Sequence, residues 1–209
     1  MNGILKNFIV FEGGDGSGTS TQLSLLGDKF AGSGNKPVFY PTFEPTESAI
    51  GVIIRSALKK DIVFKAETLA RLFAADRTEH LYAAGGIVER CRRGELVVCD
   101  RYVLSSLVYQ GIECGEELPQ SLNSAFPAPE LLLFFDIDPQ TALERLQNRS
   151  SLEIYERLEF QKKVRERYHS LLSGYKNAGI RVEIIDASQS VEKVAEDVWK
   201  AVSKMPIFE

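Results

Sequence analysis

A glycine-rich run with several hydroxyl side chains follows the first strongly apolar segment of the chain. It consists of Gly13, Gly14, Asp15, Gly16, Ser17, Gly18, Thr19, Ser20 and Thr21. The run matches the phosphate-binding pattern G-x-x-x-x-G-K-[ST] at every fixed position except the lysine, where Thr19 stands. Glycines let backbone N–H groups surround a phosphate, and the N-terminus of a following helix adds partial positive charge. The sequence therefore predicts a nucleotide-phosphate site here, with the Ser20 hydroxyl as a Mg²⁺ ligand.

The missing lysine leaves two interpretations open. A lysine would place a full positive charge at the transferring phosphate, whereas Thr19 offers only a hydroxyl. Either other cations compensate for it, or the chain binds nucleotide without efficient phosphoryl transfer.

Two further residue pairs could recognise a nucleotide. Phe73 and Arg77 lie one turn apart on a predicted helix, so a ring that stacks on a base and a guanidinium that donates to a carbonyl share one face. Core packing is the alternative for Phe73 taken alone. Asp100 and Arg101 follow a predicted buried strand, and ligands bind beyond the carboxyl ends of strands in open parallel sheets. A carboxylate there can hold Mg²⁺ and an arginine can bind a phosphate with two N–H groups.

Short apolar runs alternate with helical periods, which predicts an α/β fold with helices on both faces of a five-stranded parallel sheet. Because the runs show little alternation, we expect both faces of every strand to be buried. The predicted strands are residues 8–12, 38–40, 95–99, 131–135 and 181–185. The predicted helices include one ended by residues 32–37, one over 66–92 with a break at Gly85-Gly86, and others over 139–148, 155–175 and 191–202.

Length and composition narrow the class of protein. A chain of 209 residues with 44% hydrophobic residues can form one domain, residues 1–209. A formal net charge of −4 gives no support for binding a nucleic acid polymer. Apolar runs are too short to cross a bilayer and no signal-peptide pattern is present, so we expect a cytoplasmic protein with no membrane association. The cysteines and the two histidines have no zinc-finger spacing, which favours free thiols over a metal cluster.

Several motifs in the same order resemble the thymidylate kinase family, and together they cover nearly the whole chain. They are FEGGDGSGTSTQ at 11–22, EPTESAIGVIIR at 44–55, LFAADRTEH at 72–80, DRYVLSSLVYQG at 100–111, FFDIDPQTALER at 134–145 and IDAS at 185–188. The resemblance implies a P-loop kinase that transfers the γ-phosphoryl group of ATP to dTMP, giving dTDP and ADP, with Mg²⁺. It also implies a homodimer.

The resemblance assigns roles to individual residues. Asp15 would bind the deoxyribose 3′-hydroxyl, Arg77 the thymine O4, and Arg55 and Arg101 the monophosphate, while Asp100 would serve Mg²⁺ and the acceptor. Tyr109 would exclude a ribose 2′-hydroxyl. A lid over residues 147–157 would close on the nucleotides and bring an arginine to the phosphates. The remaining residues implied in the dTMP site are Phe43, Phe73, Ser105 and Tyr155, and the predicted catalytic set is Asp15, Asp100, Arg101 and Arg149, with Arg157 as the runner-up.

The sequence departs from the family pattern at Thr19, at Phe43, where many relatives carry arginine, and in the lid, which lacks a second basic residue after Arg149. These departures leave three alternatives to a dTMP kinase. The chain could be a nucleotide-binding relative with weak or no transfer, a kinase for another pyrimidine nucleotide or deoxynucleoside, or a P-loop ATPase.

Overall fold

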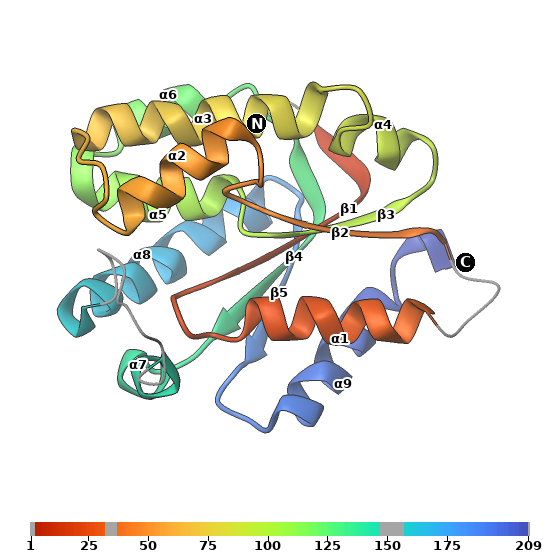
Figure 1. The fold of residues 1–209 in the computed structure, drawn as a ribbon. Coiled ribbons are helices and arrows are strands. Elements are labelled where there is room, and N and C mark those ends of the chain that lie inside the picture. Colours follow the sequence, from red (N-terminus) through yellow and green to blue (C-terminus); the bar gives the residue numbers. More distant parts are fainter. Residues whose placement is uncertain (1–2, 32–36, 147–156, 209) are drawn as a thin grey trace.

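Five parallel strands form one sheet at the centre of the computed structural model, which describes residues 3–31, 37–146 and 157–208 (Figure 1). The order across the sheet is β2-β3-β1-β4-β5, and every neighbouring pair is parallel. The predicted α/β fold with a five-stranded parallel sheet is therefore confirmed. The strands are β1 Ile4–Gly13, β2 Phe39–Phe43, β3 Leu96–Asp100, β4 Ala128–Asp136 and β5 Arg181–Asp186.

The prediction that every strand is buried on both faces is wrong for β2 and β5. These are the two edge strands, and most of their residues are partly exposed, whereas β3 is buried throughout. An edge strand has a neighbour on one side only, so fewer helices can cover it. The strand β2 also extends three residues beyond its predicted end at Tyr40, which brings Phe43 level with Asp100 at the end of β3.

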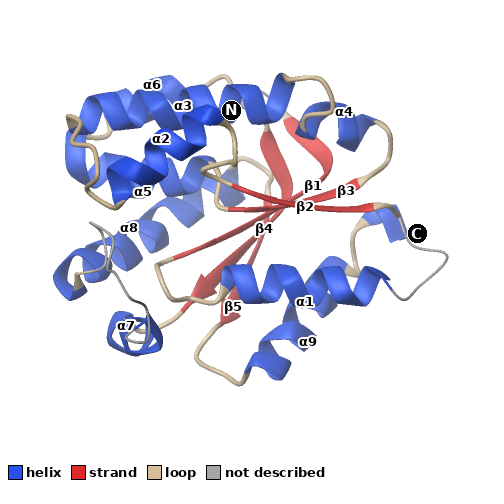
Figure 2. Ribbon diagram, viewed as in Figure 1, coloured by secondary structure: helices blue, strands red, loops and turns tan. Residues whose placement is uncertain are grey.

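Helices cover both faces of the sheet, as predicted (Figure 2). The helices α1 (Thr19–Ala31) and α9 (Val191–Val202) pack together on one face. Most of the others cover the opposite face, and α7 lies beside α8. These helices are α2 Ala49–Leu58, α3 Ala66–Tyr82, α4 Ile87–Arg92, α5 Val103–Cys114, α6 Glu117–Asn123, α7 Pro139–Leu146 and α8 Leu158–Asn177.

The alternation of side chains along β1 divides the hydrophobic core between the two layers. Ile9 and Phe11 point to the core under α1 and α9, while Phe8 and Val10 point to the opposite face. All four are essentially inaccessible to solvent. The strand is therefore anchored from both sides, and the loop that follows it leaves from a rigid support.

The helix predictions are confirmed where the structure describes them. The helix α3 ends at Tyr82 and α4 begins at Ile87, and Gly85 between them has a φ of 73°, a left-handed conformation that favours glycine. The predicted segment 32–37 that ends α1 lies almost wholly outside the described residues, as do the predicted end of α7 at 148 and the predicted start of α8 at 155. Among the described helices, none is long and apolar enough to span a membrane.

The strand order brings the predicted site residues together beyond the carboxyl ends of the strands. The chain runs from central β1 to the edge strand β2, returns to β3 beside β1, and then continues on the other side in β4. Loops that leave adjacent strands in opposite directions open a crevice at the carboxyl ends of the strands. The loops after β1 and β3, which carry Asp15 and Arg101, flank that crevice.

Candidate nucleotide-binding site

The glycine-rich loop after β1 lines a cavity of about 620 Å³ with the residues from Gly14 to Thr21. Gly16 and Gly18 have φ values of 80° and 90°, so the loop uses the backbone conformations that glycine permits. At Gly16 a Cβ atom would collide with the backbone carbonyl of Ala142 in α7. Gly13 does not line the cavity; its carbonyl accepts a hydrogen bond from Arg101 Nη1 at 2.9 Å.

Ser20 and Asp100, the two predicted Mg²⁺ ligands, are in contact. Ser20 Oγ donates to Asp100 Oδ2 at 2.6 Å. The other carboxylate oxygen, Asp100 Oδ1, is buried and has no hydrogen-bond partner among the described residues. A buried, unpaired carboxylate oxygen beside a serine hydroxyl is an arrangement of hard oxygen donors that suits Mg²⁺.

Thr19 begins α1 and is 6% exposed, with its side chain at the position where the pattern has lysine. Among the described residues that line this cavity, the cations are Arg101 and Arg145. Arg145 was not among the predicted site residues. Its Nη1 donates to the Ala187 carbonyl at 2.9 Å and ties α7 to the segment after β5. The compensating cation proposed from the sequence, Arg149, lies outside the described residues. Arg157 is described and stands, exposed, immediately before α8.

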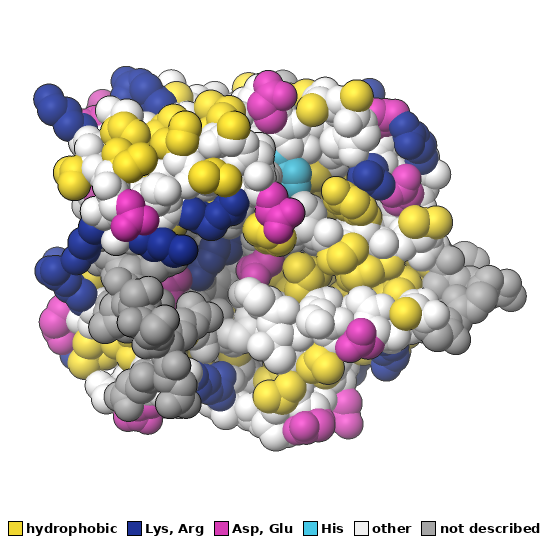
Figure 3. Space-filling model, viewed as in Figure 1, with side chains coloured by type: hydrophobic (Ala, Val, Ile, Leu, Met, Phe, Trp, Pro, Cys, Tyr) yellow, Lys and Arg dark blue, Asp and Glu magenta, His cyan; other side chains and the backbone are white. Residues whose placement is uncertain are grey.

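A second cavity of about 210 Å³ lies on the other side of Arg101. Eight of the nine residues predicted to bind dTMP line it, and the ninth, Tyr155, lies outside the described residues. Figure 3 shows Lys and Arg side chains gathered in the hollow below the apolar surface of α2 and α3. The predicted residues are Asp15, Phe43, Arg55, Phe73, Arg77, Arg101, Ser105 and Tyr109, and the others are Glu44, Pro45, Leu58, Tyr102, Ser106 and Gln110.

Arg77 forms the floor of the second cavity and is 1% exposed. Its Nε and Nη2 both donate to Glu44 Oε2, at 2.9 and 2.6 Å, and its Nη1 donates to Ser106 Oγ at 3.2 Å and to Asn123 Oδ1. Burial opposes the charge on Arg77, but the charge and hydrogen bond of Glu44 together with smaller contributions from Tyr102 and Glu12 outweigh it, so the pKa of Arg77 is raised. From the sequence Arg77 was predicted to bind a base, and Glu44 was not predicted as its partner.

Arg101 stands between the two cavities and lines both. Its Nη2 donates to Asp15 Oδ1 at 2.7 Å, and its backbone has a φ of 69°, a strained left-handed conformation for a residue with a side chain. The Arg101 N–H donates to the Phe11 carbonyl at 2.8 Å, which holds that conformation. Gln161 of α8 binds the other oxygen of Asp15 at 2.7 Å. The predicted partners of deoxyribose and monophosphate are therefore an ion pair at the junction of the cavities.

Glu12, near the end of β1, binds the residues that follow Arg101 and was not predicted as a site residue. Its Oε1 accepts from the backbone N–H groups of Tyr102 and Ser105 at 3.0 and 3.2 Å, so it caps α5. Its Oε2 accepts from the hydroxyls of Ser105 and Tyr168 at 2.6 and 3.0 Å. Burial raises the pKa of Glu12, although these hydrogen bonds act in the opposite direction. The Ser105 hydroxyl, predicted to contact a nucleoside, is thus already engaged by Glu12.

Gln110, one residue after Tyr109 in α5, was also missed. It lines the smaller cavity and is 2% exposed, and its Oε1 has no hydrogen-bond partner within the part of the chain that the structure describes. A buried amide oxygen without a partner is costly unless a ligand donates to it. The Y-Q-G motif contained this residue, but the sequence could not show that its oxygen would be unpaired.

A parallel sheet in this order and a glycine-rich loop leading into α1 define a P-loop kinase fold, with two cavities that meet at Arg101. Residues 11–198 match the thymidylate kinase family. The chain is 42% identical to a putative thymidylate kinase of Treponema pallidum over 93% of this chain and 94% of that protein. It is 38% identical to a probable thymidylate kinase of Pyrobaculum aerophilum over 96% of this chain and 98% of that protein. The chain belongs to the thymidylate kinase family, a family of phosphotransferases.

Proposed function

We propose that this protein transfers the γ-phosphoryl group of ATP to dTMP, giving dTDP and ADP. The observation that carries the proposal is the pair of cavities that meet at Arg101, one lined by the glycine-rich loop and the other by Phe73, Arg77 and Tyr109. Phosphoryl transfer requires the donor and the acceptor to meet with their charges neutralised. ATP would occupy the larger cavity, and the acceptor phosphate would reach Arg101 from the smaller one.

The smaller cavity has the polar groups that a thymine base would need. The ring of Phe73 can stack on the base, and Arg77 can donate to thymine O4. The unpaired Gln110 Oε1 can accept a hydrogen bond from thymine N3–H, a donor that cytosine lacks at N3. Arg55, whose Nη1 now donates to the Pro45 carbonyl at 2.7 Å, would be the second ligand of the monophosphate.

Mg²⁺ would be held by Ser20 and Asp100, together with ATP phosphates, and would neutralise charge on the transferring group. The loop N–H groups and the start of α1 would bind the phosphate oxygens. A lid over residues 147–157 would exclude water, which suppresses hydrolysis of ATP.

The test is a coupled ADP-release assay with ATP, Mg²⁺ and a panel of nucleosides and nucleoside monophosphates. We expect the highest kcat/KM with dTMP and little ADP without an acceptor. Equal ADP release in the absence of any acceptor would support the ATPase alternative, and a preference for thymidine over dTMP would contradict the role of Arg101 and Arg55 as phosphate ligands.

Tyr109 is expected to select deoxyribose. Its ring lies 5.4 Å from the guanidinium carbon of Arg101, and its hydroxyl is 3.4 Å from Arg101 Nη1, beside the predicted sugar ligand Asp15. We expect Tyr109→Ala to raise kcat/KM for UMP relative to dUMP by roughly tenfold, because removal of the ring opens space for a 2′-hydroxyl. Tyr109→Phe is the matched control and should keep the preference. An unchanged ratio in Tyr109→Ala would remove this role.

The lid is expected to provide the charge that Thr19 does not. We expect Arg149→Ala to lower kcat by at least about tenfold, a part of the roughly 10³–10⁵-fold that an arginine contributes in related phosphoryl transfer. Thr19→Lys should rescue part of that loss. If Arg149→Ala and Arg157→Ala both turn over like the wild type, the compensation proposal is wrong. If the wild type transfers no phosphoryl group and Thr19→Lys does, the protein is a nucleotide-binding relative.

We also propose that the protein forms a homodimer and that it is cytoplasmic. Large apolar side chains are exposed on α2 and the turn that follows it, where Figure 3 shows hydrophobic atoms gathered, and a second copy of the chain would cover them in a homodimer. The three cysteines are free thiols, which suits a cytoplasmic location. The exposed residues are Val52, Ile53, Ile62, Val63 and Phe64.

A further inference from the structure

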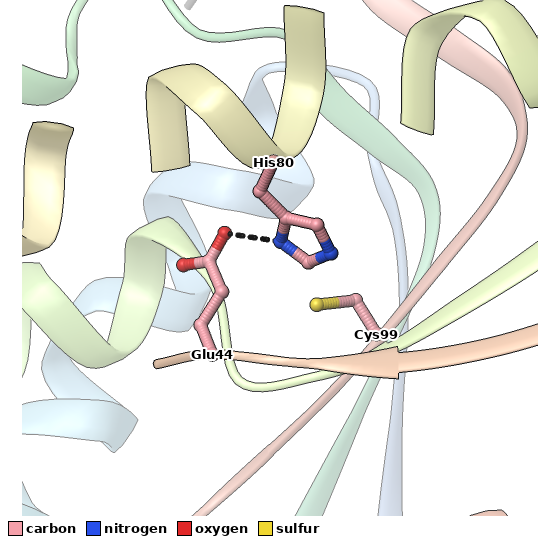
Figure 4. Close-up of side chains that lie close together, drawn as sticks. All are labelled: Glu44, His80 and Cys99. Carbon is pink, nitrogen blue, oxygen red and sulfur yellow. Dashed lines mark hydrogen bonds and ion pairs between the residues drawn. The ribbon is translucent and has the colours of Figure 1, made fainter. Parts of the chain in front are cut away.

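Three side chains of different chemistry converge behind the smaller cavity. They are Glu44 immediately after β2, His80 on α3 and Cys99 on β3, and their ligand atoms all lie within 4.8 Å of one another. Figure 4 shows the carboxylate, the imidazole and the thiol pointing toward a common centre. The residues are far apart in the sequence, so their spacing gave no indication of a cluster. Carboxylate oxygen, imidazole nitrogen and thiolate sulfur are the ligand types of zinc sites.

We propose that Glu44, His80 and Cys99 form a binding site for a thiophilic divalent cation, zinc in the first instance. The site is separate from the Mg²⁺ site at Ser20 and Asp100, which offers only oxygen ligands.

The hydrogen bonds of Glu44 leave one of its oxygens available. Both donors of Arg77 bind Oε2, whereas Oε1 faces His80 Nδ1 at 3.1 Å. A cation bound between Oε1 and Nδ1 would replace the proton they share and would leave the Arg77 pair in place. The positive charge of Arg77 is already matched by Glu44, and the thiolate of Cys99 would offset part of the charge of the cation.

The second nitrogen of His80 also has the partner that a metal-bound histidine needs. His80 Nε2 lies 2.6 Å from Thr42 Oγ1. When Nδ1 binds a metal, Nε2 carries the proton and donates it to a second-shell oxygen, which fixes the orientation of the ring. Thr42 therefore orients His80 on one side of the site as Arg77 orients Glu44 on the other.

Zinc binding requires the three ligand atoms to move closer together and the Cys99 thiol to lose its proton. Ligand atoms around a tetrahedral zinc stand about 3.3–3.6 Å apart, so a separation of up to 4.8 Å in the cluster must shrink by at most about 1 Å. The S–H bond of Cys99, which donates to the Arg101 carbonyl at 3.0 Å, breaks as the zinc–sulfur bond forms, and its proton leaves to solvent. The proton on His80 Nδ1 is replaced by zinc, and the neutral ring carries its proton on Nε2 instead. Water can supply the fourth ligand, because Glu44 lines the smaller cavity and the His80 side chain is 9% exposed.

The experiment measures metal binding by the full chain without nucleotide and in excess Mg²⁺, which occupies oxygen-only sites. Zinc is quantified by equilibrium dialysis, and Co²⁺ is added to a second sample to reveal the near-ultraviolet charge-transfer band of a cobalt–thiolate bond. We expect one cation per chain and a cobalt–thiolate band in the wild type. Both are expected to be lost in Cys99→Ser, and His80→Gln should lose the tight binding.

Matched controls test the cluster itself. Cys91→Ser removes another buried thiol and His169→Gln the other histidine, and both variants should bind like the wild type. Zinc should also raise the Tm of the wild type but not of Cys99→Ser or, if that variant is unfolded, Cys99→Ala. The proposal is overturned if the wild type binds no zinc at micromolar concentrations, or if the folded Cys99 variant keeps the bound cation. No turnover is measured, so the result does not depend on the kinase activity.

Discussion

Replacing Arg77 with leucine is expected to lower the free energy of unfolding by roughly 3–5 kcal/mol, the cost of leaving one partner of a buried ion pair uncompensated. The Arg77 and Glu44 side chains are 1% and 2% exposed, so water cannot solvate the carboxylate that remains. Ser106 and Asn123 would also lose their donor. Urea unfolding of Arg77→Leu measures the effect.

Arg71, an exposed arginine on the same helix α3, provides the control. Arg71→Ala should change the free energy of unfolding by no more than about 0.5 kcal/mol. The double variant Glu44→Gln/Arg77→Leu should be more stable than the sum of the single effects predicts, because the uncompensated charge is gone. If Arg77→Leu and the wild type have the same urea concentration at the midpoint of unfolding, the stabilising role of this ion pair is contradicted.

The same residue should set the preference for the base. In conditions where Arg77→Leu is folded, we expect the preference for dTMP over dCMP to fall by about 1–3 kcal/mol, the range for a hydrogen bond to a charged group. Arginine donates to the O4 of thymine, whereas cytosine has an amino group at that position. If the folded variant keeps its full preference, Arg77 supports the cavity but does not recognise the base.

Replacing Arg101 with alanine is expected to give the largest loss of activity, roughly a thousand-fold or more in kcat/KM, in line with arginines that neutralise transferring phosphoryl groups. Arg101 lines both cavities and is held by Asp15 and the Gly13 carbonyl, so its charge is fixed where the two ligands meet. Arg101→Lys keeps the charge but cannot bind a phosphate with two parallel N–H groups. Its activity should therefore fall between that of the wild type and that of Arg101→Ala. Steady-state kinetics with each substrate varied gives the values.

Arg181 is a matched control, because it lies on β5 and pairs with Glu183 outside both cavities. Arg181→Ala should keep wild-type kinetics. Circular dichroism should show that Arg101→Ala is folded, since Glu12 still caps α5. Retention of kcat/KM within about tenfold in Arg101→Ala would place the phosphate ligand elsewhere.

The sequence determined the fold and the positions of most of the lining residues. Uninterrupted apolar runs occur where strands are buried on both sides, and the helical period of α9 follows from a single buried face, so both were predicted from local pattern alone. The phosphate-binding loop was likewise predicted from its glycines, because Gly16 and Gly18 have backbone conformations that other residues rarely adopt. The edge strands were predicted less well, because burial depends on which strand has two neighbours.

Only the tertiary structure decided how the site residues are paired. Glu12, Glu44 and Gln110 all stand in motifs that are visible in the sequence. The roles of Glu12 and Glu44 come from distant partners, such as Tyr168 for Glu12 and Arg77 for Glu44, and that of Gln110 from a buried oxygen that the described residues leave unpaired. Hydrogen bonding and burial depend on distances set by the strand order, which residue spacing does not encode. For the same reason residue spacing did not predict that Glu44, His80 and Cys99 lie together, since the sheet and α3 bring them into one place.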